Sequence, residues 1–121
     1  MYSDKHRAAD CLQDILDNIA LIEKFIAGHD QYEIDADELR HAALERWLER
    51  ICEAAFRLGQ RSSALMPDHP WQRIRGFGNR LRHAYDQIDF DIVWAILTDE
   101  LPRLKIDAAE ALERVQAKDP A

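Results

Sequence analysis

Apolar residues recur at intervals of three and four along most of the chain, which is the spacing of one face of an α-helix. The first stripe lies within residues 4–27, where Ser3 or Asp4 can cap the start of a helix and Gly28 can end it. Its apolar residues are Leu12, Ile15, Ile19, Ile22 and Ile26. The pattern predicts one long helix, followed by a polar connection over residues 29–35.

A second stripe predicts a helix that stops at Gly59. Asp35 can cap its start, because Glu38 three residues later completes a box-like arrangement. The apolar residues of this face are Leu44, Leu48, Ile51, Ala55 and Leu58, with Trp47 beside them. Residues 60–70, of sequence QRSSALMPDHP, form the longest predicted loop.

Two further helices are predicted in the second half of the chain. The third begins at Pro70, whose missing N–H is harmless in a first turn, and continues through Gly76 and Gly78. Its stripe is Ile74, Phe77, Leu81 and Ala84. Asp89 can cap the fourth helix, and Pro102 is expected to kink or divide it. The apolar positions of this last segment are Val93, Ile96, Leu97, Leu101, Leu104, Ala108, Leu112 and Val115.

No alternating run or β-branched cluster indicates a strand. The pattern therefore predicts an all-α fold, an antiparallel up-and-down bundle of four to five helices in one domain, residues 1–121. No run approaches the ~18 apolar residues of a membrane span, and the first residues lack the apolar region of a secretory signal. We therefore expect a cytoplasmic protein without a membrane partner. In that compartment Cys11 and Cys52 are expected as buried thiols rather than a disulfide.

The charge is distributed unevenly along the chain. The net charge is −7, but residues 73–85 contain four arginines and no acid. Since those arginines contribute +4, the rest of the chain carries −11. The acidic total argues against a protein that binds nucleic acid by charge alone. A local basic patch on an acidic body favours a confined phosphate site.

Four side chains of this basic stretch combine into a candidate site. Asn79, Arg82, His83 and Tyr85 stand three and four residues apart, so on a helix neighbouring members share a face. A histidine can take a proton from a ribose 2′-OH, and an arginine can hold the phosphate. These groups suffice for metal-free RNA cleavage by internal transesterification. A solvated helix end is the alternative, and spacing alone favours that alternative.

Other patterns carry weaker signals. Gly76 and Gly78 lack the third glycine of a nucleotide loop, so close approach of a neighbouring helix explains them better, although each costs the helix ~1 kcal/mol. The histidines show no metal-ligand spacing, and no metal or cofactor is expected. Glu45, Glu49 and Glu53 are most simply a solvated helical face. The three tryptophans are expected as core or interface anchors.

Residues 70–85, PWQRIRGFGNRLRHAY, resemble the HepT-like branch of the HEPN superfamily. The likeness continues through residues 88–96, IDFDIVWAI, and through the Leu-Pro pair at 101–102. Residues 45–54, ERWLERICEA, fit the same pattern, so the resemblance covers nearly the whole chain. It implies a helical homodimer with the motif helices meeting in a cleft between subunits.

The resemblance also implies a function. Members of that branch are metal-independent ribonucleases that act as toxins, paired with a nucleotidyltransferase antitoxin of the MntA type. The antitoxin inactivates the toxin by adding AMP to the motif tyrosine. Carried over by position, His83 is the catalytic histidine and Tyr85 is the modified residue. Asn79 is the polar residue that follows the motif arginine.

One position departs from the family motif, Arg-x4-His-x-Tyr. The arginine would fall at residue 78, where this chain has Gly78. Losing a catalytic guanidinium can remove several kcal/mol of transition-state stabilisation. Arg82 or Arg75 can supply the charge instead, and Arg75 and Arg80 are candidates for binding RNA phosphates.

Three hypotheses follow. The first is a ribonuclease toxin acting on RNA, with His83 as general acid/base, Arg82 holding phosphate and Asn79 orienting the substrate. The second is a dimeric, catalytically silent module that binds a nucleotidyltransferase, which the glycine at residue 78 favours. The third is a structural helical dimer without a ligand.

Overall fold

The computed structural model describes residues 4–67, 69 and 89–117. Every element in these ranges is helical, which confirms the predicted all-α bundle. The α-helices are α1 (Asp4–Ile26), α2 (Gln31–Asp35), α3 (Glu38–Leu58), α4 (Gln60–Leu65), α6 (Phe90–Ala95) and α7 (Leu101–Ala117), and a π-helical turn, η1 (Ile96–Glu100), joins the last two. The third predicted helix falls at residues 70–88, outside the described residues.

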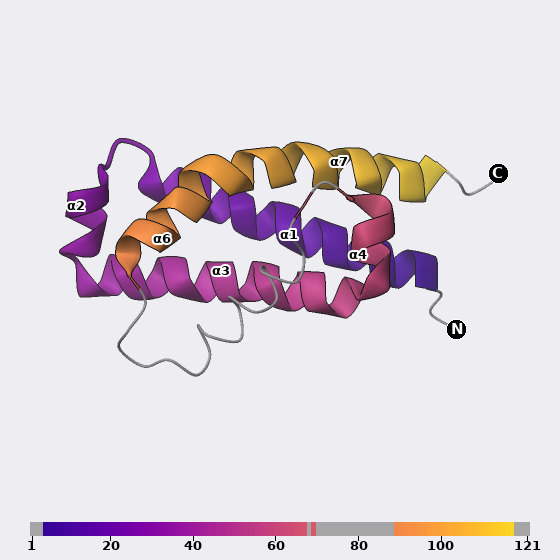
Figure 1. Ribbon diagram of the computed structural model, residues 1–121, viewed down its shortest axis with the longest axis horizontal. Helices are drawn as coiled ribbons and strands as arrows, with labels where there is room; N and C mark the ends of the chain where they lie inside the picture. Colours follow the sequence, from indigo (N-terminus) through magenta and orange to yellow (C-terminus); the bar gives the residue numbers. More distant parts are fainter. Residues whose placement is uncertain (1–3, 68, 70–88, 118–121) are drawn as a thin grey trace.

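Helix α1 lies between α3 and α7 and packs against both of them (Figure 1). It runs antiparallel to its two neighbours, so α3 and α7 point in the same direction. Helix α2 and the start of α6 lie at one end of the bundle, whereas α4 lies at the other end. The described elements on either side of residues 70–88 are therefore widely separated along the bundle axis.

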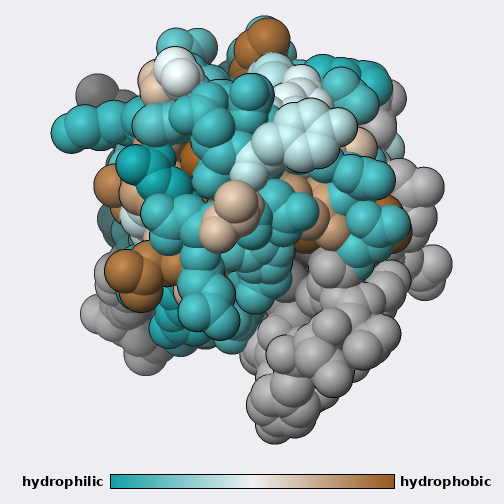
Figure 2. Space-filling model, turned by 90° about the vertical axis from the view of Figure 1, so that its left-hand side faces the viewer, coloured by the Kyte–Doolittle hydropathy of each residue, from teal (hydrophilic) through white to brown (hydrophobic). Residues whose placement is uncertain are grey.

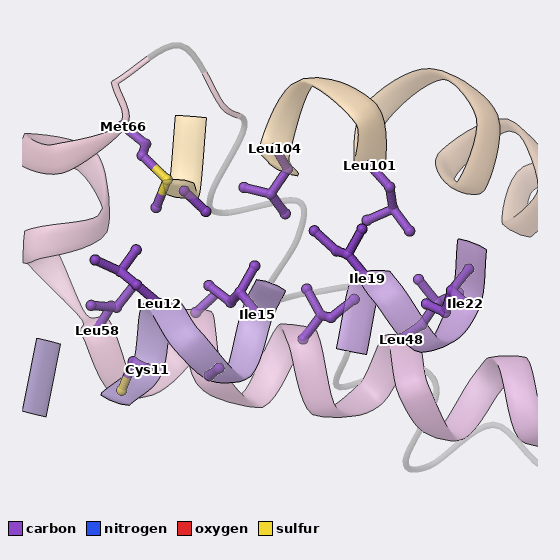
Figure 3. Packing of buried hydrophobic residues seen from close by; sticks show 14 of the residues in the cluster. Cys11, Leu12, Ile15, Ile19, Ile22, Leu48, Leu58, Met66, Leu101 and Leu104 are labelled. Carbon is purple, nitrogen blue, oxygen red and sulfur yellow. The ribbon is translucent and has the colours of Figure 1, made fainter. Parts of the chain in front are cut away.

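One apolar cluster fills the space between these helices, and it contains the predicted stripe of α1 (Figure 3). Leu12, Ile15 and Ile19 are completely buried. Full burial of each such side chain stabilises the fold by about 1.5–3 kcal/mol. Partners from other elements include Leu48, Leu58, Met66, Leu101 and Leu104. Because α1 contributes to the cluster along its whole length, it is the central helix of the bundle.

The two glycine helix stops are confirmed. Gly28 and Gly59 have φ angles of 78° and 60°, in the left-handed region that glycine adopts without strain. Gly59 is the C-cap of α3, and its N–H donates to the carbonyls of Ala55 and Phe56. The first helix ends at Ile26, one residue before the predicted end.

The segment predicted as a polar connection contains a helix instead, and that prediction is wrong. Asp30 caps α2 with a complete capping box: its side chain accepts from the Glu33 N–H at 2.9 Å, while Glu33 accepts from the Asp30 N–H at 3.1 Å. The short helix is held by Ile34, which is completely buried. Asp35 does not cap α3; Asp37 does, accepting from the N–H groups that open the helix.

The longest predicted loop also begins as a helix. Residues 60–65 form α4 directly after the Gly59 stop, so a loop over the whole of 60–70 was a wrong prediction. The physical reason is the apolar pair that follows the serines. Leu65 packs against the core, and Met66 enters it with 2% of its surface exposed.

The last segment is divided just before Pro102, as predicted: α6 ends at Ala95, the π-helical turn η1 follows, and α7 begins at Leu101. The helix axis changes direction between α6 and α7 (Figure 1). In η1 the Leu101 N–H donates to the Ile96 carbonyl, five residues back. The Thr98 hydroxyl donates to the Trp94 carbonyl at 2.9 Å. The wider turn keeps three core residues at successive spacings of four on one face, namely Val93, Leu97 and Leu101.

Both cysteines are buried thiols that form no disulfide, as predicted. No helix among the described residues is long and apolar enough to cross a membrane.

Candidate functional site

All the predicted site residues fall within 70–88, outside the described residues. They are Arg75, Asn79, Arg80, Arg82, His83 and Tyr85, together with Gly78 at the position of the motif arginine. The structure therefore neither joins nor separates them. It describes the two flanks, which are the places where the chain leaves α4 and where it returns at α6.

The upstream flank is attached to α7 by polar contacts. The His69 imidazole is nearly enclosed, with 5% of its side chain exposed, and its Nε2 lies 2.5 Å from the Asp107 Oδ2. Two helical turns further along α7, Arg114 donates from Nη2 to the Leu65 carbonyl at 2.7 Å. A small open pocket of about 140 Å³ lies between these contacts, with Pro67 and Glu110 in its lining.

The downstream flank is held by α2 and α3. Asp89 caps α6 by accepting from the Asp91 N–H at 2.9 Å. The buried ring of Phe90 packs against the His41 imidazole, with centroids 4.6 Å apart. Gln31 of α2 donates a hydrogen bond to the Asp91 carboxylate. Asp89, the first described residue after 70–88, is therefore held in place at the end of the bundle that carries α2.

His41 lies between two carboxylates. Its Nδ1 is 3.0 Å from Glu45 on α3, and its Nε2 is 3.6 Å from Asp35 at the end of α2. Glu45 belongs to the predicted solvated row of acids. Glu49, in the same row, lies 3.3 Å from Arg46. Two members of the row, Glu45 and Glu49, therefore contact neighbouring side chains of α3.

A second cluster closes the junction of α1, α2 and α3. The Arg40 guanidinium stands over the Phe25 ring, 5.5 Å from its centroid, and Phe25 meets Trp47 edge to face at 5.1 Å. Arg40 Nη1 donates to His29 Nε2 at 2.9 Å, so the His29 Nδ1 carries a proton and faces Glu33 at 3.3 Å. These contacts tie the helix junction together.

The pKa values of two side chains are shifted: that of Glu33, in the cluster just described, and that of Cys11, in the apolar core. The Asp30 N–H, followed by His29, lowers the pKa of Glu33 below its ordinary value. Burial raises the pKa of the Cys11 thiol, and the smaller effect of Arg57 opposes it. A raised pKa makes Cys11 a poor nucleophile. Within the described ranges, no group of three His, Cys, Asp or Glu residues could hold a metal ion.

The end of the bundle that carries α2 is mostly hydrophilic (Figure 2). Its apolar side chains are separated by polar ones in that view. Tyr32 and Leu39 are more than four-fifths exposed, and Ile92 is about half exposed. These residues are scattered over three elements.

Comparison with known proteins identifies the family. The sequence model described as "Ribonuclease HepT-like" matches residues 15–111, which is most of the chain. The chain belongs to the Ribonuclease HepT-like family. The matched range begins in α1, ends in α7 and includes residues 70–88 with both of their flanks.

Two relatives in this family are about equally similar. A protein of Thermococcus cleftensis named "Probable ribonuclease HepT" is 31% identical over 101 residues, covering 84% of this chain and 92% of its own. One from Methanocaldococcus jannaschii named "Putative RNase MJ1380" is 30% identical over 94 residues, covering 78% and 86%. No solved structure gave a significant match.

Neither flanking attachment of this HepT-like protein could be predicted from its sequence. His69 and Asp107 are 38 residues apart, so no helical spacing relates them. Only the apolar Leu65–Met66 pair could have indicated that the chain before residue 70 returns to the core. At the other flank, the capping pattern of Asp89 was recognised, but the contact between His41 and Phe90 has no sequence signal.

Proposed function

We propose that this chain is an endoribonuclease that cuts RNA without a metal ion. The observation that carries the proposal is the family match over residues 15–111, a range that includes the basic stretch with His83. Relatives named as ribonucleases support it. The concentration of arginine in an otherwise acidic chain also favours a local phosphate site.

The proposed reaction is internal transesterification. His83 takes the proton from a ribose 2′-OH, and the oxygen attacks the adjacent phosphorus. The new P–O2′ bond gives a 2′,3′-cyclic phosphate as the P–O5′ bond breaks, and the protonated His83 then acts as general acid and returns its proton to the departing 5′ oxygen. Arg82 holds the phosphate as negative charge develops on it, and Asn79 orients the substrate. Arg75 and Arg80 bind phosphates of the RNA.

Cleavage of end-labelled RNA in the presence of a metal chelator tests this proposal. The wild type is expected to produce 2′,3′-cyclic phosphate ends, and His83→Ala is expected to produce none. His6→Ala is the matched control, because His6 is an exposed histidine at the start of α1. A folded wild type that leaves RNA intact defeats the proposal, as does cleavage by His83→Ala at the wild-type rate.

We further propose that the protein is a cytoplasmic homodimeric toxin whose antitoxin is an MntA-type nucleotidyltransferase. The resemblance of residues 70–85 to the HepT-like motif supports this pairing, and Tyr85 is the residue that would receive AMP. Co-expression with the nucleotidyltransferase should relieve growth arrest and increase the intact mass by one AMP group. Tyr85→Phe should prevent the mass change, whereas Tyr32→Phe, at an exposed position of α2, should not.

A catalytically silent binding module is the second candidate, and Gly78 at the position of the motif arginine favours it. This candidate predicts a stable complex with the nucleotidyltransferase and no RNA cleavage by the free protein. Assays of RNA cleavage and of complex formation, with purified dimer whose mass shows no added AMP, decide between the two candidates. Cleavage supports the enzyme, and complex formation without cleavage supports the silent module.

A further inference from the structure

The contact between His69 and Asp107 joins a point outside the helices to the middle of α7. The Nε2 and Oδ2 atoms are within hydrogen-bond distance, and the imidazole is almost fully enclosed, with 5% of its side chain exposed. Hydrogen bonds to an ionised carboxylate are stronger than those between neutral groups. Asp107 keeps about a third of its side chain exposed. The carboxylate therefore lies at the edge of the protein and reaches inward to a buried ring.

Nearby contacts from the same helix reinforce this attachment. Arg114 donates to the Leu65 carbonyl at 2.7 Å, and it stands seven residues after Asp107. Seven residues are close to two helical turns, so both side chains lie on one face of α7. Met66, between the two attachment points in sequence, is buried in the core. Leu65, Met66 and His69 are thus all bound within a few residues of one another.

Around residues 65–69, apolar burial and hydrogen bonding have different effects on the chain: the first anchors it and the second orients it. Burial of Met66 holds the chain against the core, but the hydrophobic effect has no direction. A hydrogen bond requires a defined distance and angle, so the Asp107 carboxylate determines the orientation of the His69 ring as well as its position. Met66 alone would leave that orientation unspecified. The two polar contacts consequently add orientation to a segment that is already anchored.

The orientation of His69 is relevant to function because of its place in the sequence, directly before the motif-bearing stretch. Residue 70 opens the stretch that matches the HepT-like motif, and His83 follows fourteen residues after His69. We propose that Asp107 is a positioning residue for RNA cleavage, acting through His69 on the point from which the motif-bearing chain departs. This inference rests on the proposed ribonuclease function. It adds α7, which carries none of the proposed catalytic residues, to the parts of the protein on which cleavage depends.

The test compares steady-state RNA cleavage by Asp107→Ala, Asp107→Asn and the wild type, at a temperature where circular dichroism shows all three fully folded. We expect Asp107→Ala to lower kcat by about tenfold or more while KM changes by less than about twofold, because misplacement of catalytic groups reduces the rate more than binding. Asp107→Asn should stay within about threefold of wild-type kcat, since its amide oxygen can still accept from Nε2–H. Glu113→Gln, an exposed acid on the same helix, is the control and should match the wild type.

A folded Asp107→Ala protein with wild-type kcat overturns the proposal, and so does a loss of activity that only follows the folded fraction. If Asp107→Ala does not fold, His69→Ala and His69→Gln replace it. The glutamine amide can return a donor to the same region, so equal kcat values for these two variants also overturn the proposal. A wild type that cuts no RNA has a different meaning: the ribonuclease function itself has failed, and the positioning role fails with it.

Discussion

The imidazole of His41 packs against the ring of Phe90, with centroids 4.6 Å apart and planes inclined by 36°. This contact joins α3 to the first residue of α6. Asp89 caps the same helix end, and Phe90 itself is buried in the apolar cluster. The first described residues after the 70–88 range are therefore held by apolar packing, a helix cap and a ring contact together.

The first prediction concerns the packing of Phe90, which joins α6 to α3. Phe90→Ala should lower the free energy of unfolding by about 3 kcal/mol, because it removes a buried aromatic side chain and leaves a cavity. Phe90→Leu should cost less than half as much, since it keeps most of the buried volume. Ile92→Ala, at an exposed position of the same helix, should change stability by less than about 0.5 kcal/mol. Urea denaturation measures all three, and equal losses for Phe90→Ala and Ile92→Ala would contradict the packing role.

The second prediction concerns pH and the capping box of α2. The Asp30 N–H and His29 lower the pKa of Glu33 from its ordinary value of 4.5, so the folded protein favours the ionised carboxylate. Its contribution to stability is therefore present above pH 4.5 and is lost as the pH falls through the lowered folded pKa. Glu33→Gln removes the charge but can still accept the backbone hydrogen bond.

Thermal denaturation at a series of pH values checks this linkage. Glu33→Gln should be less stable than the wild type near neutral pH, and the difference should shrink as the pH drops below 4.5. Glu113→Gln, which removes an exposed acid from α7, serves as the control for the loss of one surface carboxylate. A stability difference for Glu33→Gln that stays constant down to low pH would exclude the proposed linkage.

The elements that the sequence predicted well are those defined by local, repeating signals. The stripe from Leu12 to Ile22 repeats at the helical period for several turns, and glycine at residues 28 and 59 supplies the left-handed conformation that ends a helix. Such signals lie within a few residues of the structure that they produce. For this reason the long helices α1 and α3, the sides that face the core and the glycine stops that follow them could be predicted without knowledge of the tertiary fold.

The elements that could not be predicted from the sequence depend on contacts between residues distant in sequence. Helices α2 and α4 are too short for a periodic stripe, and a single buried side chain, Ile34 or Met66, binds each segment to the core. Asp30 and Glu33 have the spacing of a capping box, but no apolar run follows them to indicate a helix. The π-helical turn before Pro102 also has no periodic signal in the sequence. It lies between residues of the core, Leu97 and Leu101, whose burial depends on the assembled bundle.

The third prediction concerns the two thiols. Cys11 and Cys52 are both buried, and burial raises the pKa of Cys11. Both should react slowly with a thiol reagent at pH 8, because reaction requires local or global opening. An opening that costs about 3 kcal/mol slows labelling by roughly a hundredfold relative to the unfolded chain. Labelling followed by mass spectrometry, with and without denaturant, measures this ratio, and rapid modification of the folded protein would contradict the described burial.

The last prediction concerns the arginine that the family motif places at residue 78. If Arg82 supplies the missing charge, as proposed, Arg82→Ala should lower kcat by about a hundredfold or more, the scale of a lost transition-state donor. Adding Gly78→Arg to Arg82→Ala should recover a substantial part of that loss, because it restores a guanidinium at the motif position. Gly76→Arg in the same background is the matched control, since it adds the same charge two residues away. Equal recovery by the two glycine variants would show that general positive charge suffices, whereas full activity of Arg82→Ala would remove Arg82 from the proposed mechanism.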